Sequence, residues 1–470
     1  MIESANFNDL KNVLCIYPWK RGVSVTNWLP PIGLEYISAS IEKIGIHTDL
    51  VDMRFESDPA PLAEYQTKAV CISVNWEDQL NILAWLTKHF QSDQSIIVGG
   101  RAASFNSEEV LQNNPHVKIV VRGDGEQTTR EVFSGKPIEK ITGLSYRKDG
   151  KIFHNPSRRF NTIPEDIYPD RSRRRNSYHI RMRDFDTGIS FDLLSSSRGC
   201  PFHCKFCTFN KDPLGGKRQW VGRSPQSVVR ELEDIEAKYI LFTDDHFAAD
   251  IKRVEAICDL ILLMKVKKTL GVALRIEVAF HEEVLKKMFK AGFRFLSLGI
   301  ESTKDKTLLE MEKGFDTVKV REACKLLRKY PFILVGYFLI GNIGENEEDM
   351  LRTADFADEL GLDFIYASYL KMEKHSQLEK LVEKSSEYYL DNKGFVCSKS
   401  YSRDHLKSIR HRIQRRFYTI SKFLAIARKV FQYHLFSWQD VLKITFRGWR
   451  HSRDRIKRIK QHHQSNIRHQ

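Results

Sequence analysis

The chain has 470 residues, of which 41% are hydrophobic and 11% aromatic, and this composition excludes disordered and fibrous proteins. At roughly 100–200 residues per domain, the length predicts two to four domains. The longest apolar run, residues 333–341, falls far short of the roughly 20 residues of a membrane-spanning helix. The polar N-terminus lacks the apolar core of a secretory signal, so we expect a cytoplasmic protein.

The net charge of +15 belongs to one end of the chain. Residues 401–470 contain 18 Lys and Arg against 3 Asp and Glu, whereas the other 400 residues carry equal numbers of basic and acidic side chains. A neutral body therefore carries one basic tail, and the charge alone does not indicate a nucleic-acid-binding protein.

The first 140 residues alternate short apolar strands with helices. Strands are expected at residues 12–17, 48–51, 69–74, 96–98 and 117–121, with helices at 33–44 and 77–90. Continuous β-branched runs separated by helices are typical of a parallel sheet that is buried on both faces. We therefore predict a Rossmann-like domain over residues 1–140.

Residues 141–185 read as a hairpin followed by a linker. Asp149-Gly150 between two short strands is a hairpin signal. The stretch from Arg171 to Arg183 carries six arginines and is interpreted as a solvated crossing between domains.

From residue 186 the alternation restarts on a longer period. Strands are expected at 189–194, 239–243, 272–278, 295–300, 332–340 and 363–369, with helices between them. This pattern predicts an α/β fold with a partial (β/α)6 TIM-like barrel over residues 186–375 and chemistry at the carboxyl ends of its strands. No strands are expected after residue 372, and residues 376–470 are predicted to form a helical, basic C-terminal region.

Three cysteines crowd together after the first barrel strand. Cys200, Cys204 and Cys207 have C-x3-C-x2-C spacing, and three thiolates on one tight loop can hold three corners of a [4Fe–4S] cluster. The fourth iron would then lack a protein ligand, as in catalytic metal sites that keep a position open. The alternative is a zinc site with His203 as the fourth ligand, but its place next to Cys204 is poor for tetrahedral closure.

The cysteine motif, with Phe206 as the aromatic of C-x-aromatic-C, resembles the signature of the radical S-adenosylmethionine (SAM) superfamily. The resemblance implies that the open iron chelates SAM and that the reduced cluster cleaves it to methionine and a 5′-deoxyadenosyl radical. It covers most of residues 10–370. An external electron donor of the flavodoxin or ferredoxin type is implied as well.

Further elements resemble the family's SAM contacts. They fall within or at the ends of successive predicted strands, and the candidate SAM-binding residues are Phe206, Asp244, Asp245, Arg275, Glu301 and Gly341. Arg275 is expected inside its strand, Glu301 belongs to a G-[IV]-E-S element, and Gly341 opens a G-x-P-G-E-like element in which Ile343 replaces proline. Each has a plainer alternative, such as an ion pair or, for the two aspartates, a helix cap.

The first domain resembles the cobalamin-binding module of one large radical SAM subgroup, which also contains class B methyltransferases and the anaerobic Mg-protoporphyrin ester cyclase. The expected cobalamin-binding residues are Gly33, Ser73, Gly99, Gly100, Gly123, Gly125 and Glu126. A D-x-H-x-x-G motif is missing, since none of the sixteen histidines has glycine three residues on, so a histidine ligand to cobalt is not expected. The alternative is a module that has kept the fold and lost the cofactor.

The tail interleaves aromatic residues with Arg and Lys. Three interpretations remain open: helices packed on the barrel, an amphipathic segment on a membrane surface, or a polyanion-binding arm. We expect packing for residues 376–440 and peripheral contact with anionic lipid for 441–460.

Three functional hypotheses follow. The first, carried by the resemblance, is a cobalamin-dependent radical SAM enzyme that methylates an unactivated carbon of a small-molecule or lipid-like substrate. The second is radical cyclisation or rearrangement without methyl transfer. The third is a membrane- or RNA-binding protein with a vestigial cluster; we do not expect a nucleic-acid partner, because the neutral body carries the cofactor features. The sequence assigns no catalytic side chain.

Overall fold

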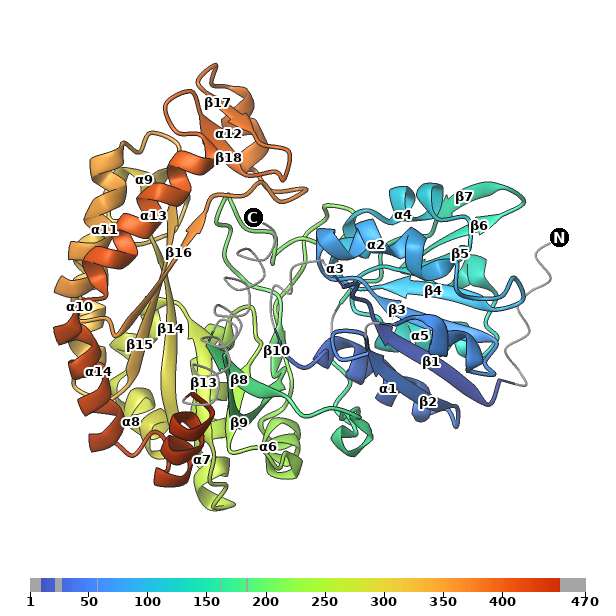
Figure 1. Ribbon diagram of the computed structural model, residues 1–470, viewed down its shortest axis with the longest axis horizontal. Helices are drawn as coiled ribbons and strands as arrows, with labels where there is room; N and C mark the ends of the chain where they lie inside the picture. The colour runs from blue at the N-terminus through green and yellow to red at the C-terminus, as the bar shows by residue number, and fades with distance from the viewer. Residues whose placement is uncertain (1–9, 22–27, 57, 161, 183–184, 449–470) are drawn as a thin grey trace, which may run out of the picture.

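The computed structural model describes residues 10–21, 28–56, 58–160, 162–182 and 185–448. Two α/β units lie side by side, and an extended segment around residues 155–178 joins them (Figure 1). A small C-terminal lobe and two long helices complete the second unit.

The first unit is built on one sheet. In chain order it contains β1 (Asn12–Tyr17), α1 (Ile32–Glu42), β2 (His47–Asp52), η2 (Ala60–Glu64), β3 (Ala69–Ser73), α2 (Glu77–Thr87), β4 (Ser95–Gly99), α3 (Arg101–Phe105), α4 (Ser107–Asn113), β5 (Val117–Val121), α5 (Glu126–Phe133), η3 (Ile138–Lys140), β6 (Leu144–Lys148) and β7 (Lys151–His154). The strand order is β2-β1-β3-β4-β5-β6-β7.

Strands β1 to β5 are parallel, as the apolar runs predicted. One face packs against α1 and α5 through residues such as Val13 and Val132, and the other against α2 to α4 through residues such as Leu83 and Leu111. The predicted hairpin is confirmed: β6 and β7 turn at Asp149-Gly150 and extend this sheet as two antiparallel strands.

The second unit is a half-barrel with appended helices. It contains η4 (Arg171–Arg173), β8 (His179–Met182), β9 (Phe185–Leu194), β10 (Ser197–Arg198), β11 (Val221–Gly222), α6 (Pro225–Asp234), β12 (Tyr239–Phe242), η5 (Phe247–Ala249), α7 (Ile251–Leu263), β13 (Thr269–Leu274), η6 (Ile276–Phe280), α8 (Glu282–Lys290), β14 (Phe293–Glu301), α9 (Asp305–Glu310), α10 (Thr317–Leu327), β15 (Ile333–Ile340), α11 (Glu347–Glu359), β16 (Phe364–Tyr369), α12 (Leu378–Glu383), β17 (Tyr388–Leu390), β18 (Val396–Ser398), α13 (Arg403–Phe417) and α14 (Ile420–Gln432).

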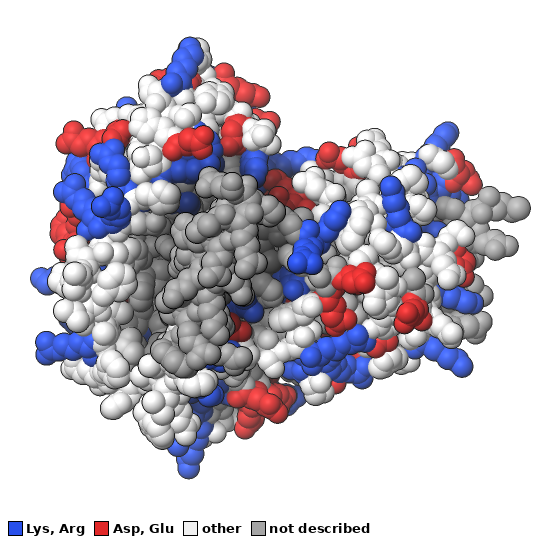
Figure 2. Space-filling view, in the orientation of Figure 1, with Lys and Arg blue, Asp and Glu red and all other residues white. Residues whose placement is uncertain are grey.

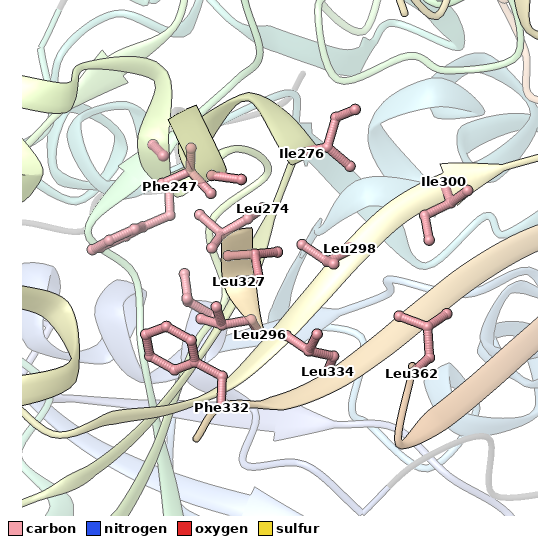
Figure 3. Close-up of a cluster of buried hydrophobic side chains, with 14 of the residues drawn as sticks. Phe247, Leu274, Ile276, Leu296, Leu298, Ile300, Leu327, Phe332, Leu334 and Leu362 are labelled. Atoms are coloured by element: carbon pink, nitrogen blue, oxygen red, sulfur yellow. The ribbon is translucent and has the colours of Figure 1, made fainter. Parts of the chain in front are cut away.

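Its main sheet has the order β16-β15-β14-β13-β12-β9-β8, with β9 and β12 to β16 parallel and β8 antiparallel at the edge. The helices cover the outer face, and side chains such as Leu274, Leu296 and Leu334 pack beneath them in one large apolar core (Figure 3). The inner face turns toward the first unit (Figure 1). This is the partial barrel that the sequence predicted.

Two details of the prediction were wrong. Arg275 does not lie within a strand, because β13 ends at Leu274 and the backbone turns there into η6. Residues beyond 372 do contain strands: the short antiparallel pair β17 and β18. Strands of three residues leave too little alternation to be seen in a sequence.

The interpretation of the arginine-rich linker as solvated was also wrong. Arg174 donates to Glu35 of α1 and to Asp192 of β9, with N–O distances of 2.7 Å. Arg171 donates to Glu231 of α6 at 2.8 Å. Both guanidinium groups are largely buried between the two units, so the linker contributes ion pairs to the domain interface.

The two long C-terminal helices behave differently. Packing is confirmed for α13, which buries Leu406, Ile409, Ile413 and Phe417 against the barrel. In α14, Ile426 is the residue that is buried. Of the predicted lipid-contacting segment 441–460, residues 441–448 are helical and the remainder lies outside the described residues. In the described residues, no helix is long and apolar enough to cross a membrane.

Candidate functional site

A cavity of about 340 Å³ lies where the carboxyl edge of the first sheet faces the second unit. Its wall includes all seven residues expected to contact cobalamin: Gly33, Ser73, Gly99, Gly100, Gly123, Gly125 and Glu126. In the sheet, the parallel strands lie in the order β2-β1-β3-β4-β5. This is the strand order of doubly wound sheets, which bind ligands at this edge. The sequence motifs therefore converge on one site.

Two of these glycines contribute to the site in different ways. Gly100 has φ +96°, and a Cβ there would approach the Val74 carbonyl oxygen to 2.5 Å, so only glycine allows α3 to begin so close to β3. At Gly33, near the start of α1, a Cβ would meet nothing within 4 Å. Gly100 shapes the wall of the cavity, whereas Gly33 leaves space in it.

The second unit closes the cavity with Ser197, Arg198, Phe209, Arg218 and Asp245 among others. Arg198 is important because it lies two residues before Cys200 in the chain. No sequence motif had marked this arginine as a site residue.

Arg198 forms a buried clamp between the units. Its guanidinium donates to Glu126 Oε1 at 2.5 Å and to Asp124 Oδ1 at 3.0 Å, and Arg218 donates to Asp124 Oδ2 at 2.8 Å. Burial alone would raise the pKa of the Glu126 carboxyl, but Arg198 and Arg218 outweigh burial and hold that pKa below its ordinary value. Glu126 is therefore an anion at neutral pH, paired across the interface.

A second buried contact joins the same wall to the barrel. Tyr36 of α1 lines the cavity, and its hydroxyl donates to Glu231 Oε2 of α6 at 2.9 Å. Glu231 is also paired with Arg223, and both side chains are almost wholly inaccessible to solvent. The cavity and the domain interface thus share side chains.

The cysteine loop follows β10. Cys204 is buried, whereas Cys200 and Cys207 are partly exposed. Burial, together with the other two cysteines, raises the pKa of Cys207 to about 12, so thiolates are disfavoured there without a compensating cation. The Gly199 N–H donates to Asp245 Oδ2 at 2.7 Å and thereby fixes the start of the loop.

In the described residues, no three side chains of His, Cys, Asp or Glu lie together as they would around a single metal ion, and this holds for the three loop cysteines as well as for His203. The expected fourth ligand, His203, has its Nδ1 3.0 Å from Asn210 Nδ2.

The two aspartates after β12 hold the loop rather than cap a helix. Asp244 accepts hydrogen bonds from Ser196 N–H at 2.7 Å and from the hydroxyls of Ser196 and Ser197. Burial raises the pKa of Asp244 and also that of Asp245. The N-cap of the following helix α7 is Asp250, so the capping alternative was wrong for both residues.

Arg275 directly follows β13 and contacts the loop, and Glu301 ends the next strand, β14. Arg275 Nη1 lies 3.6 Å from Cys204 Sγ, and its guanidinium stacks over Phe202. Glu301 pairs with Lys313 at 2.9 Å and has φ +71°, an unfavourable conformation for a residue with a side chain. Of the expected SAM contacts, Phe206 belongs to the cysteine loop, Arg275 lies beside Cys204, and Asp245 lines the cavity.

Gly341 and Phe206 lie toward the C-terminal lobe. Gly341 has φ +77° and approaches Leu406 of α13. In the same turn, Glu345 accepts from Ser302 at 2.9 Å, which joins the G-I-E-S and G-N-I-G-E elements. Phe206 packs beside Met311 and Leu378. Glu345 belongs to the G-x-P-G-E-like element but was not among the expected SAM contacts, and Lys313 was missed because a lone charged residue has no distinctive spacing.

Comparisons with known proteins agree with this arrangement. Residues 194–357 match the family model of the radical SAM superfamily, and residues 19–133 match that of the B12 binding domain. An uncharacterized methyltransferase of Pyrococcus horikoshii is 27% identical over 372 residues, which cover 73% of this chain and 76% of that protein.

Two further similarities span both units. The anaerobic magnesium-protoporphyrin IX monomethyl ester cyclase of Synechocystis is 22% identical over 64% of this chain, and the match spans 62% of that protein, less than two thirds of its length. The structure of the radical SAM methyltransferase TsrM from Kitasatospora setae, with cobalamin and a [4Fe–4S] cluster bound, superposes with a TM-score of 0.66 at 17% identity, covering 82% of this chain and 81% of that one. The chain therefore combines a B12 binding domain over residues 19–133 with a radical SAM domain over residues 194–357.

Proposed function

We propose that the protein is a cobalamin-dependent radical SAM methyltransferase that acts on an unactivated carbon. The observation that carries the proposal is a cavity whose wall combines the seven expected cobalamin contacts with Ser197 and Arg198, directly before the cysteine loop. When bound, the cluster and SAM supply a 5′-deoxyadenosyl radical, and cobalamin carries the methyl group.

The side chains present fit these groups. Cys200, Cys204 and Cys207 would hold three irons, with Arg275 supplying positive charge beside Cys204. The glycine-lined edge accommodates a flat ligand, and Gly33 leaves open space where a side chain would intrude. We assign the SAM contacts to Asp245, Glu301 and the turn at Gly341, with Asp244 holding the loop that bears the cysteines.

The substrate is proposed to be a small molecule with an apolar, uncharged surface at its reacting end. In the described strands β12 to β16, the positions that face the inside of the half-barrel and lie deeper than Glu301 carry no charged side chain. Tyr337 and Tyr366 pair there, with ring centroids 5.3 Å apart, and both remain partly exposed. An external flavodoxin or ferredoxin would supply the electron.

Methyl transfer and cyclisation differ in one product. Anaerobically purified protein, loaded with cobalamin and given SAM and a strong reductant, is expected to form 5′-deoxyadenosine and also about one S-adenosylhomocysteine per bound cobalamin, because methyl transfer from SAM leaves that product. Formation of 5′-deoxyadenosine without S-adenosylhomocysteine would reject methyl transfer and favour the cyclase alternative.

Gly33 gives a graded test of the cavity. We expect Gly33→Ala to keep cobalamin, because the new Cβ has no neighbour within 4 Å. Gly33→Leu is expected to lower bound cobalamin by roughly tenfold or more, since its branched end would occupy the cavity. Bound cobalamin is measured by absorbance after gel filtration. Equal loading of both variants would show that cobalamin does not use this cavity.

A further inference from the structure

Helix α14 is oriented with its polar side toward the protein. Lys422 pairs with Asp358 at 2.7 Å and Lys429 pairs with Asp363 at 2.6 Å, both across the seam between α14 and the barrel. Ile426 is buried between these two lysines. An amphipathic surface helix normally places its apolar stripe on this side.

The apolar stripe of α14 faces solvent instead. Ile420 is 81% exposed and Leu424 67% exposed, and Phe423 and Phe431 are also exposed, although Phe423 stacks on Tyr418. Spacings of three, four and seven residues place these four side chains on one face of the helix. Side chains of this size on one outward face mark a surface that binds something apolar.

The next helical segment also exposes large apolar side chains. In residues 438–448, Trp438 is 71% exposed and Leu442, one turn later, is exposed as well. This segment is anchored to the barrel by Asp440, which accepts a hydrogen bond from the Tyr239 hydroxyl at 2.8 Å. We call Ile420, Phe423, Leu424, Phe431, Trp438 and Leu442 the outer apolar face.

The segment that carries the outer apolar face is basic. Its described part, residues 420–448, contains five Lys and Arg against one Asp, Asp440, which is buried. The acidic groups packed against α14 are Asp358 and Asp363, which are both paired with its lysines. Figure 2 shows the edge where α14 lies as largely uncharged with blue side chains at its margin.

We propose that the outer apolar face docks the protein on the surface of an anionic lipid bilayer. Large apolar side chains, an exposed tryptophan and surrounding basic residues are the features with which a helix lies in the interface of a bilayer rather than spanning it. The basic residues add electrostatic attraction to anionic headgroups. A nucleic acid would leave the apolar side chains in water, so the combination favours lipid.

The test is flotation of the full-length protein with vesicles of phosphatidylcholine alone or mixed equally with phosphatidylglycerol. Binding to the anionic vesicles is expected, falling at high salt. The double variant F423S/L424S should weaken it by roughly tenfold or more, because two large apolar side chains no longer enter the interface. Leu309→Ser, at a leucine that is 79% exposed on α9, is the matched control and should bind like the wild type.

Three outcomes would overturn the proposal: no binding to anionic vesicles, equal binding to neutral ones, or unchanged binding by the double variant. A lipid-free dimer, seen by light scattering and lost in the double variant, would also overturn it, because a second copy would then cover the outer apolar face. Since flotation needs neither cluster nor cobalamin, the result is independent of the proposed chemistry.

Discussion

Cys204→Ala is expected to abolish the iron–sulfur cluster and with it all formation of 5′-deoxyadenosine. Cys204 is the buried member of the three loop cysteines, and Arg275 lies 3.6 Å from its sulfur. Two remaining thiols cannot hold three corners of a cluster. Iron content, the absorbance of the reconstituted protein and 5′-deoxyadenosine by chromatography measure the effect, which should be complete within detection.

Cys324→Ala is the control for this prediction. Cys324 is buried in the core beneath the barrel helices and is far from the loop in the chain. Removing its sulfur should cost about 1 kcal/mol or slightly more of stability and leave cluster content unchanged. If Cys204→Ala retained 5′-deoxyadenosine formation at the level of Cys324→Ala, the assignment of the cysteine loop would be wrong.

Arg198→Leu is expected to have the second largest effect, because it removes the clamp between the cysteine loop and the cavity wall. Glu126 and Asp124 would remain between the units without this partner, and breaking a buried pair on one side costs about 3–5 kcal/mol. We expect lower thermal stability and a large loss of bound cobalamin, while the three cysteines still assemble a cluster. Cobalamin and iron are measured on the same sample.

The pH dependence of stability distinguishes loss of the Arg198 clamp from a general packing defect in the variant. The pKa of Glu126 is depressed in the folded protein, so its pairing stabilises the fold above the unfolded-state pKa of roughly 4.3 and is lost as pH falls through the folded value. The difference in unfolding free energy between wild type and Arg198→Leu should therefore shrink below about pH 4. Arg321→Leu, which breaks an exposed pair with Glu359, is the control and should cost less than about 1 kcal/mol at any pH.

The sequence predicted the sheets because the residues of each strand carry the pattern that identifies it. Val117–Val121 is a β-branched run interrupted only by Lys118, and its bounds agree with β5. The cavity could also be anticipated, since glycines at the ends of successive parallel strands must meet at one edge. In both cases the signal lies within a few neighbouring residues.

The interface could not be predicted in this way. Arg174 looked solvated because its partners, Glu35 and Asp192, are distant in the chain, and nothing local distinguishes a paired arginine from a free one. The same limit applied to α14. Its spacing reveals an apolar stripe, but the side that faces the protein depends on Asp358 and Asp363, which belong to other elements.

Tyr36 has a consequence for how the two halves of the molecule respond to a ligand. Its ring lines the cavity, and its hydroxyl is held by Glu231 of the barrel, so filling the cavity and docking the units are linked equilibria. A ligand that binds only the docked arrangement stabilises it by a free energy that grows with the logarithm of the ligand concentration relative to its dissociation constant. By reciprocity, whatever holds the units together raises affinity for the ligand by the same factor.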